Sequence, residues 1–250
     1  MRRIGLLICG CLWGACAVGA APPVKTQNVN LPSGNETIVG YLALPETAGK
    51  HPAVVLIHES WGLNDWVKEQ ARKLAEQGYV ALAVDLYRGE VAYDPSLAWE
   101  LMHNVPPDRA IRDLKAGFDF LAARPEVNKD KIGSVGWDMG GGYSLQLAIN
   151  EPNLAACVVN YGAMPTDAAD IQKIKAPVLG NYGAEDRGIP VKDVRAFEDA
   201  MKAANKSLDV KIYPGAVHSF ENPNNKLGYR EVAAEDAWNR TLSFLDHNLK

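Results

Sequence analysis

The stretch Lys131-Ile-Gly-Ser-Val-Gly-Trp-Asp-Met-Gly-Gly-Gly142 decides the fold of this chain. Its apolar run at 132–135 is typical of a short buried strand, and helix-compatible residues resume directly after Gly142. Between the two, Gly136 and Gly140 flank Asp138 in a Gly-x-X-x-Gly pattern. Placed between a strand and a helix, this pattern is a nucleophile elbow, whose central residue occupies a strained turn. Glycines are needed on both sides because a Cβ atom there would collide with the neighbouring strand and helix. The usual central residue is Ser or Cys, whereas this chain has Asp138.

Strand and helix patterns alternate outward from this turn. The sequence predicts a polar, irregular segment over 21–34, then strands over 37–44 (at the sheet edge), 52–58, 79–84, 154–160, 176–182 and 208–213. It predicts helices over 65–77, 95–104, 108–124, 191–204 and 232–249. Such alternation favours an α/β fold with a mostly parallel sheet and helices on both faces, and it leaves no room for a cap domain. Sites in these sheets gather at the carboxyl ends of the strands.

The first 20 residues differ from the rest of the chain. Arg2 and Arg3 precede an apolar stretch over 4–18, and small residues lead to Ala20. This layout predicts a secretory signal peptide over residues 1–20, cleaved near Ala20, and therefore an exported protein, periplasmic or secreted. A retained membrane anchor is the alternative, but the apolar run is short for a span of ~20 residues. Residues 21–250 fit one α/β domain with a full core.

Charge and cysteine content narrow the partners. Cleavage would remove Arg2 and Arg3, so 26 basic residues become 24 against 30 acidic residues, a net charge of −6. No Lys/Arg cluster remains, which argues against nucleic acid or, after cleavage, a membrane as partner. Cys157 would be the one cysteine left, within an apolar run that predicts a buried strand, so we expect a core residue and no disulfide. We expect a small-molecule substrate and no cofactor, and the sequence leaves the oligomeric state open.

Three polar residues follow successive predicted strands in the order nucleophile, acid, base. Asp138 occupies the elbow, Asp186 follows the strand ending at Tyr182, and His218 follows the last strand. An imidazole held by a carboxylate can exchange protons near neutral pH, which is what hydrolysis needs. Taken singly, Asp186 and His218 are also ordinary loop residues; their joint order favours a triad.

The loop after the 52–58 strand contributes further candidates. It reads His58-Glu59-Ser60-Trp61-Gly62. Its backbone N–H groups lie where an oxyanion hole forms, and we expect the donors to be Ser60 N–H and Met139 N–H. Glu59 is either a second catalytic carboxylate or a solvated loop acid.

These motifs together resemble the dienelactone hydrolase family over nearly all of residues 21–250. The matching residues are His58-Glu59-Ser-Trp-Gly62 with Asn64, Asp85-Leu-Tyr87, Gly136-Trp-x-Met-Gly-Gly141, Asp186 before Pro190, and His218-Ser-Phe220. The resemblance implies one compact α/β-hydrolase domain without a metal. It also implies opening of a lactone or ester by an elbow cysteine with the matching Asp and His, and a glutamate at Glu59 that switches the cysteine between resting and active states.

The chain departs from this pattern at two places. The elbow carries Asp138 where the family has cysteine. The resemblance also implies two arginines for a substrate carboxylate; Arg88 approximates one, or is a solvated surface arginine, and Asn222 stands near the expected second. With Trp61 and Trp137 beside the turn, these residues are the substrate-binding candidates.

The elbow aspartate leaves four hypotheses open. The first, which we favour, is a dienelactone hydrolase-like enzyme that cleaves a small lactone or carboxylic ester through Asp138 or a water activated by His218. The second is a hydrolase at saturated carbon of the dehalogenase or epoxide-hydrolase type, because attack there gives an ordinary aspartyl ester, whereas attack on an ester gives a mixed anhydride. The third is a small-molecule binder of the same fold without turnover. The fourth is that Asp138 replaces a native cysteine.

Overall fold

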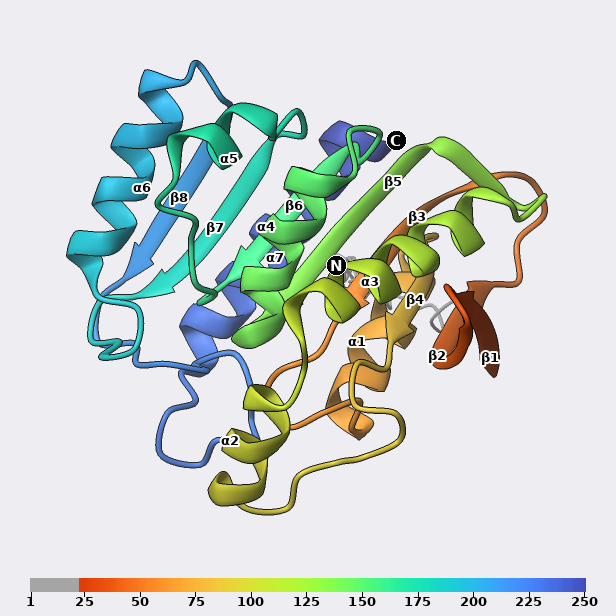
Figure 1. The fold of residues 1–250 in the computed structure, drawn as a ribbon, viewed down its shortest axis with the longest axis horizontal. Coiled ribbons are helices and arrows are strands. Elements are labelled where there is room, and N and C mark those ends of the chain that lie inside the picture. Colours follow the sequence, from red (N-terminus) through yellow and green to blue (C-terminus); the bar gives the residue numbers. More distant parts are fainter. Residues whose placement is uncertain (1–22) are drawn as a thin grey trace, which may run out of the picture.

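The computed structural model describes residues 23–250, so the predicted signal peptide lies outside the described residues. One eight-stranded sheet runs through this part of the chain (Figure 1). The strands are β1 (Val24–Ser33), β2 (Glu36–Pro45), β3 (His51–Ile57), β4 (Val80–Val84), β5 (Val127–Trp137), β6 (Ala156–Asn160), β7 (Val178–Gly183) and β8 (Leu208–Tyr213). Their order across the sheet is β1-β2-β4-β3-β5-β6-β7-β8. Pairing is antiparallel at β1/β2 and β2/β4 and parallel from β4 to β8, which confirms the mostly parallel sheet.

Helices cover both faces of the sheet, as predicted. The helices are α1 (Asp65–Glu76), α2 (Pro95–His103), α3 (Pro107–Ala122), α4 (Met139–Asn150), α5 (Ala168–Lys173), α6 (Val191–Ala203) and α7 (Glu231–Leu249). Helices α3, α4 and α6 cover one face of the sheet, and α1 and α7 cover the other (Figure 1). Alternate β3 residues face these opposite layers: Val55 and Ile57 pack in the first core, and Val54 and Leu56 pack in the second. The central strands β3, β4 and β6 read as nearly continuous apolar runs because both of their faces are buried.

The amino-terminal part of the sheet corrects the sequence analysis. The segment over 21–34, expected to be irregular, contains the ten-residue strand β1, so β1 and not β2 forms the edge. The hairpin turns through Gly34, whose φ of 60° suits glycine, and Gly34-Asn35 is a two-residue hairpin signal. Polar side chains do not prevent pairing, because the ladder to β2 uses backbone groups and most β1 side chains face solvent. The short helix α5 was also not anticipated.

The topology brings the candidate residues to one edge. Glu59 and Ser60 follow β3, Asp138 follows β5, Asp186 follows β7 and His218 follows β8, each at the carboxyl end of a parallel strand. Within residues 23–250 no helix combines the length and the apolar composition that crossing a membrane requires.

Candidate active site

The turn between β5 and α4 has the geometry of a nucleophile elbow. Asp138 has φ 54° and ψ −122°, a conformation that non-glycine residues rarely adopt. A Cβ atom on Gly136 would overlap the carbonyl oxygen of Gly140, and one on Gly140 would overlap the carbonyl oxygen of Ile57. The expected collision of flanking side chains is therefore confirmed, and the turn holds the carboxylate of Asp138 at the carboxyl edge of the sheet.

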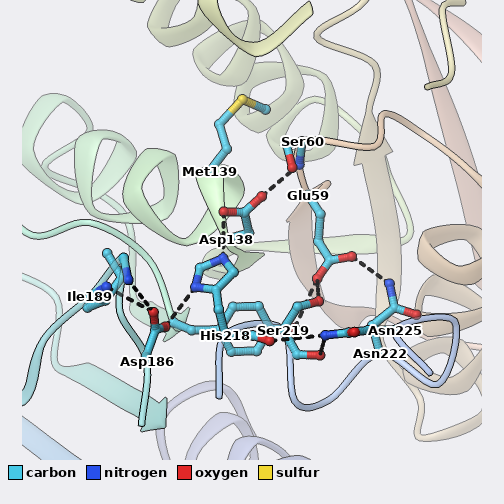
Figure 2. A network of polar contacts seen from close by, with 12 residues as sticks. Glu59, Ser60, Asp138, Met139, Asp186, Ile189, His218, Ser219, Asn222 and Asn225 are labelled. Carbon is cyan, nitrogen blue, oxygen red and sulfur yellow. Dashed lines mark hydrogen bonds and ion pairs between the residues drawn. The ribbon is translucent and has the colours of Figure 1, made fainter. Parts of the chain in front are cut away.

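The side chains of Asp138, His218 and Asp186 form a continuous chain (Figure 2). His218 Nε2 lies 2.9 Å from Asp138 Oδ1, and His218 Nδ1 lies 2.7 Å from Asp186 Oδ2. Asp186 is fixed in turn, because its Oδ1 accepts the N–H groups of Gly188 at 2.8 Å and Ile189 at 3.0 Å. Asp186 is 5% exposed, so its hold on the imidazole is shielded from water. The structure thus brings the three predicted triad residues together in the predicted order.

Two carboxylates change the protonation of His218. Burial alone would lower the pKa of the imidazole, but the hydrogen bonds and charges of Asp138 and Asp186 outweigh it and raise the pKa to about 10. Burial would likewise raise the pKa of Asp138, yet the hydrogen bond and charge of His218, with the Ser60 N–H group, hold that pKa below its ordinary value. At neutral pH the centre is therefore an imidazolium between two carboxylates, a proton donor and not a base.

The expected oxyanion-hole donors lie beside the carboxylate of Asp138. Ser60 N–H donates to Asp138 Oδ2 at 3.0 Å (Figure 2). Met139 is the first residue of α4, where a backbone N–H has no acceptor within the helix. Both oxygens of Asp138 are thus engaged, one by His218 and one by Ser60.

Glu59 is a buried member of a separate network and not a solvated loop acid. It is 1% exposed; Oε1 accepts the hydroxyls of Ser219 at 2.7 Å and Tyr161 at 3.1 Å, and Oε2 accepts the Asn222 amide at 2.6 Å. Burial, with the charge of Asp138, raises the pKa of Glu59 to about 7 despite these donors. Tyr161 links the two networks, because its ring packs edge-on against His218 with centroids 5.3 Å apart. Its role was not anticipated, since nothing in its sequence neighbourhood distinguishes it from a core tyrosine.

The predicted substrate-binding residues do not line the hollow beside Asp138. Arg88 lies away from it, because the buried carboxylate of Asp113 draws the guanidinium into an ion pair at 2.8 Å and Glu36 pairs with it as well. Trp137 is 1% exposed and donates its indole N–H to Glu221 at 3.1 Å. Asn222 is held by Glu59, and the half-buried Trp61 lies outside the lining.

A different set of residues forms the hollow. It has a volume of about 380 Å³ and opens beside Asp138. Apart from Asp138 its lining is uncharged and largely apolar: Met102, Met139, Gly142, Tyr143, Gln146, Tyr161, Ala163, Met164, Pro165 and Ile189. Met102 comes from α2, and the 161–165 segment follows β6, one strand beyond the elbow strand. The position of 161–165 could have been inferred from the predicted strand order, but the approach of Met102 could not.

The free cysteine Cys157 lies in the core and not in the site. Cys157 is fully buried in β6, its thiol contacts the Ser144 hydroxyl at 3.3 Å, and burial raises its pKa to about 11, so it is the expected core residue. Among residues 23–250 no group of three His, Cys, Asp or Glu side chains is arranged to hold a metal ion.

Comparison with known proteins shows the family to which this fold belongs. The family model described as "Dienelactone hydrolase family" matches residues 38–249. The chain belongs to the dienelactone hydrolase family. A Methylorubrum extorquens protein named "Putative carboxymethylenebutenolidase" is 32% identical over 226 residues, covering 85% of this chain and 77% of the relative. A Bradyrhizobium protein named "Probable 2-oxo-3-(5-oxofuran-2-ylidene)propanoate lactonase" is 31% identical over 243 residues, covering 92% and 97%.

Solved structures of the dienelactone hydrolase family share the fold. The crystal structure named "Putative Dienelactone Hydrolase" from Klebsiella pneumoniae superposes with a TM-score of 0.82 at 30% identity, covering 90% of this chain and 99% of that one. The chain is therefore a dienelactone hydrolase-like hydrolase with an α/β-hydrolase fold.

Proposed function

We propose that this chain hydrolyses a small lactone or carboxylic ester, and that Asp138, His218 and Asp186 carry the reaction. The observation that supports it is the chain of contacts from Asp138 Oδ1 to His218 Nε2 at 2.9 Å and from His218 Nδ1 to Asp186 Oδ2 at 2.7 Å. Asp138 stands at the elbow of a dienelactone hydrolase-like fold, at the position where the resemblance implies a cysteine nucleophile.

In the first step Asp138 attacks the substrate carbonyl. Asp138 Oδ2 bonds to the carbonyl carbon and thereby loses the negative charge that attracts Ser60 N–H. Ser60 N–H and Met139 N–H then donate hydrogen bonds to the new oxyanion on the substrate. The His218 imidazolium, held by Asp186, gives its Nε2 proton to the leaving oxygen as the ester bond breaks. The products of this step are a mixed anhydride on Asp138, a neutral imidazole and an alcohol or enol, which is released from an ester and stays attached to the acyl group of an opened lactone.

In the second step the neutral imidazole of His218 takes a proton from water, and the hydroxide equivalent cleaves the anhydride. This releases the acid product and restores the carboxylate of Asp138 and the imidazolium. The raised pKa of His218 suits both steps, because the group begins as an acid and is regenerated as one.

The energetics of the anhydride restrict the substrate. A carboxylate displaces an alkoxide poorly, because the anhydride is less stable than the alkyl ester and the reverse reaction wins. An enol leaves more readily and then becomes a ketone, which removes the reverse reaction. The substrate class that fits Asp138 is therefore an enol or aryl ester or lactone. The name of the Bradyrhizobium relative describes an ylidene lactone with an enol leaving group of this type, and that lactone also carries a carboxylate.

Trapping the intermediate tests the proposal. The protein is mixed with α-angelica lactone, a neutral enol lactone, quenched within the first turnovers and examined by intact-mass and peptide mass spectrometry. We expect one substrate adduct on the peptide containing Asp138, converted to a hydroxamate when hydroxylamine is present. Turnover without any adduct, combined with full activity of Asp138→Asn, would contradict a covalent role for Asp138.

The proposal also predicts a pH profile with two transitions. Below about pH 7 Glu59 is protonated. As pH rises through that value its new charge opposes the nearby oxyanion, so kcat/KM falls by roughly two- to tenfold. Activity is then lost as pH rises through about 10, because His218 loses the proton that the leaving group needs.

Two matched variants assign the transition near pH 7. Glu59→Gln is expected to remove it and to keep the loss near pH 10. The control is Glu221→Gln, which makes the same substitution at another buried glutamate. Burial raises the pKa of Glu221 to about 8, but its carboxyl group accepts the Trp137 indole N–H. If Glu59→Gln still showed the transition near pH 7, that transition would belong to another group.

A second candidate function is hydrolysis at saturated carbon, favoured by the contact between Ser60 N–H and Asp138 Oδ2 at 3.0 Å. If Asp138 Oδ1 displaced a halide or opened an epoxide, water would then attack Cγ of the aspartyl ester. The oxyanion would form on Oδ2, where Ser60 N–H already donates. Halide release from an alkyl halide by the wild-type protein, lost in Asp138→Asn, would support this function.

A further inference from the structure

The hollow beside Asp138 lacks the charge that an anionic substrate needs. None of the described residues that line it is basic, and its one charged lining residue is Asp138. Around this residue the two carboxylates of Asp138 and Asp186 face the single imidazolium of His218, so the centre carries an excess negative charge. Ionised Glu59 adds to it. A substrate carboxylate placed in this hollow would be repelled and would lose its hydration without gaining a positively charged partner.

The nearby arginines lie outside the lining of the hollow. Arg88 forms ion pairs with Asp113 and Glu36. Arg109, whose charge acts on Tyr143 of the lining, donates to the backbone oxygen of Leu86 at 3.2 Å. Arg187 lines a separate hollow with Glu185, next to Asp186 and His218, and is not part of the lining beside Asp138.

The apolar lining accommodates an uncharged acyl group. Met102 from α2, Met139 from α4 and Met164 after β6 contribute three thioether side chains, and Tyr143 and Ile189 add apolar surface. Methionine side chains are flexible and polarisable, so they fit ligands of different shape better than branched side chains do. The volume of about 380 Å³ is near the lower end of the roughly 300–1,000 Å³ of small-molecule pockets.

We propose that this enzyme selects uncharged esters or lactones with an apolar acyl group, seated on the methionine side chains 102, 139 and 164, and discriminates against substrates that carry a carboxylate. The inference rests on the proposed function for turnover, and on the lining and ion pairs for its selectivity.

A pair of matched esters tests the selectivity. p-Nitrophenyl butanoate and the mono-p-nitrophenyl ester of butanedioic acid share the leaving group and the chain length and differ by one carboxylate. We expect kcat/KM for the neutral ester to be about 30- to 100-fold higher, from the repulsion of like charges a few ångströms apart. Met102→Lys is expected to reduce the ratio of kcat/KM for the neutral ester to that for the anionic ester at least about tenfold, because kcat/KM for the anionic ester rises. Met102→Gln, similar in length but uncharged, is expected to keep the wild-type preference. Equal or faster hydrolysis of the anionic ester by the wild-type protein would overturn the proposal.

A binding measurement separates this inference from the proposed function. The wild-type protein is titrated calorimetrically with 2-heptanone and with 6-oxoheptanoate, neither of which can be hydrolysed. Tighter binding of the ketone supports the selectivity even if no ester is turned over. Tighter binding of the keto acid overturns the selectivity even if esters are hydrolysed.

Discussion

Asp138→Cys is expected to raise hydrolysis of p-nitrophenyl acetate by at least about a hundredfold, while Asp138→Asn lowers it to the uncatalysed background. A thiolate forms a thioester, which is closer in energy to the starting ester than the anhydride of Asp138 is. The substitution also removes one of the two carboxylates that raise the pKa of His218. The imidazole then needs only Asp186 as partner, its pKa falls, and it can deprotonate the thiol.

The measurement is steady-state kcat/KM at pH 7 with background correction from a matched thiol. Asp65→Cys supplies it, because the Asp65 side chain is fully exposed at the start of α1 and lies outside the site. Its thiol should add only the slow acylation of a surface cysteine. Activity of Asp138→Cys at or below the wild-type level would contradict an ester hydrolase limited by its aspartate, and would favour the function at saturated carbon.

The convergence of Asp138, His218 and Asp186 could be predicted because it depends on chain order. Each residue follows a strand whose apolar run is visible in the sequence, and parallel strands end at a common edge. The elbow geometry was predictable for a similar reason, since Gly136 and Gly140 mark a turn that other residues cannot occupy.

The residues around the substrate could not be predicted in the same way. Arg88 was a reasonable candidate by its position after β4, but its direction depends on Asp113, which comes from α3 and is distant in sequence. Trp137 lies beside the elbow, yet its side chain alternates to the opposite face of β5 and packs against Trp66 of α1. These outcomes depend on which helix covers which face, and a single sequence does not determine that.

The protonation state of His218 depends still more on the distances between side chains in three dimensions. The sequence predicted an imidazole held by one carboxylate, which works as a base near neutral pH. In the structure a second carboxylate lies 2.9 Å away, and the pKa of His218 rises to about 10. The change from base to acid follows from the identity of one residue at the elbow, and it separates the proposed chemistry from that of a cysteine enzyme.

Gly136→Ala is expected to destabilise the protein by more than about 4 kcal/mol, the largest stability effect predicted for this chain. The methyl group would overlap the carbonyl oxygen of Gly140, which is backbone in the first turn of α4 and cannot rotate away. Relief would require β5 and α4 to separate, and these two elements form the centre of the core. The measurement is the urea midpoint, followed by intrinsic fluorescence of the buried tryptophans.

Gly142→Ala is the matched control, because it makes the same substitution on α4 two residues beyond Gly140. Its methyl group would lie 3.3 Å from the carbonyl oxygen of Ala163, a tight contact that a small shift relieves, and alanine favours the helix by up to about 1 kcal/mol. We therefore expect its free energy of unfolding to stay within about 1 kcal/mol of the wild-type value. If Gly136→Ala and Gly142→Ala unfolded at the same urea concentration, the separation of β5 from α4 would cost no free energy. The strained backbone of Asp138 would then not be a fixed feature of the site.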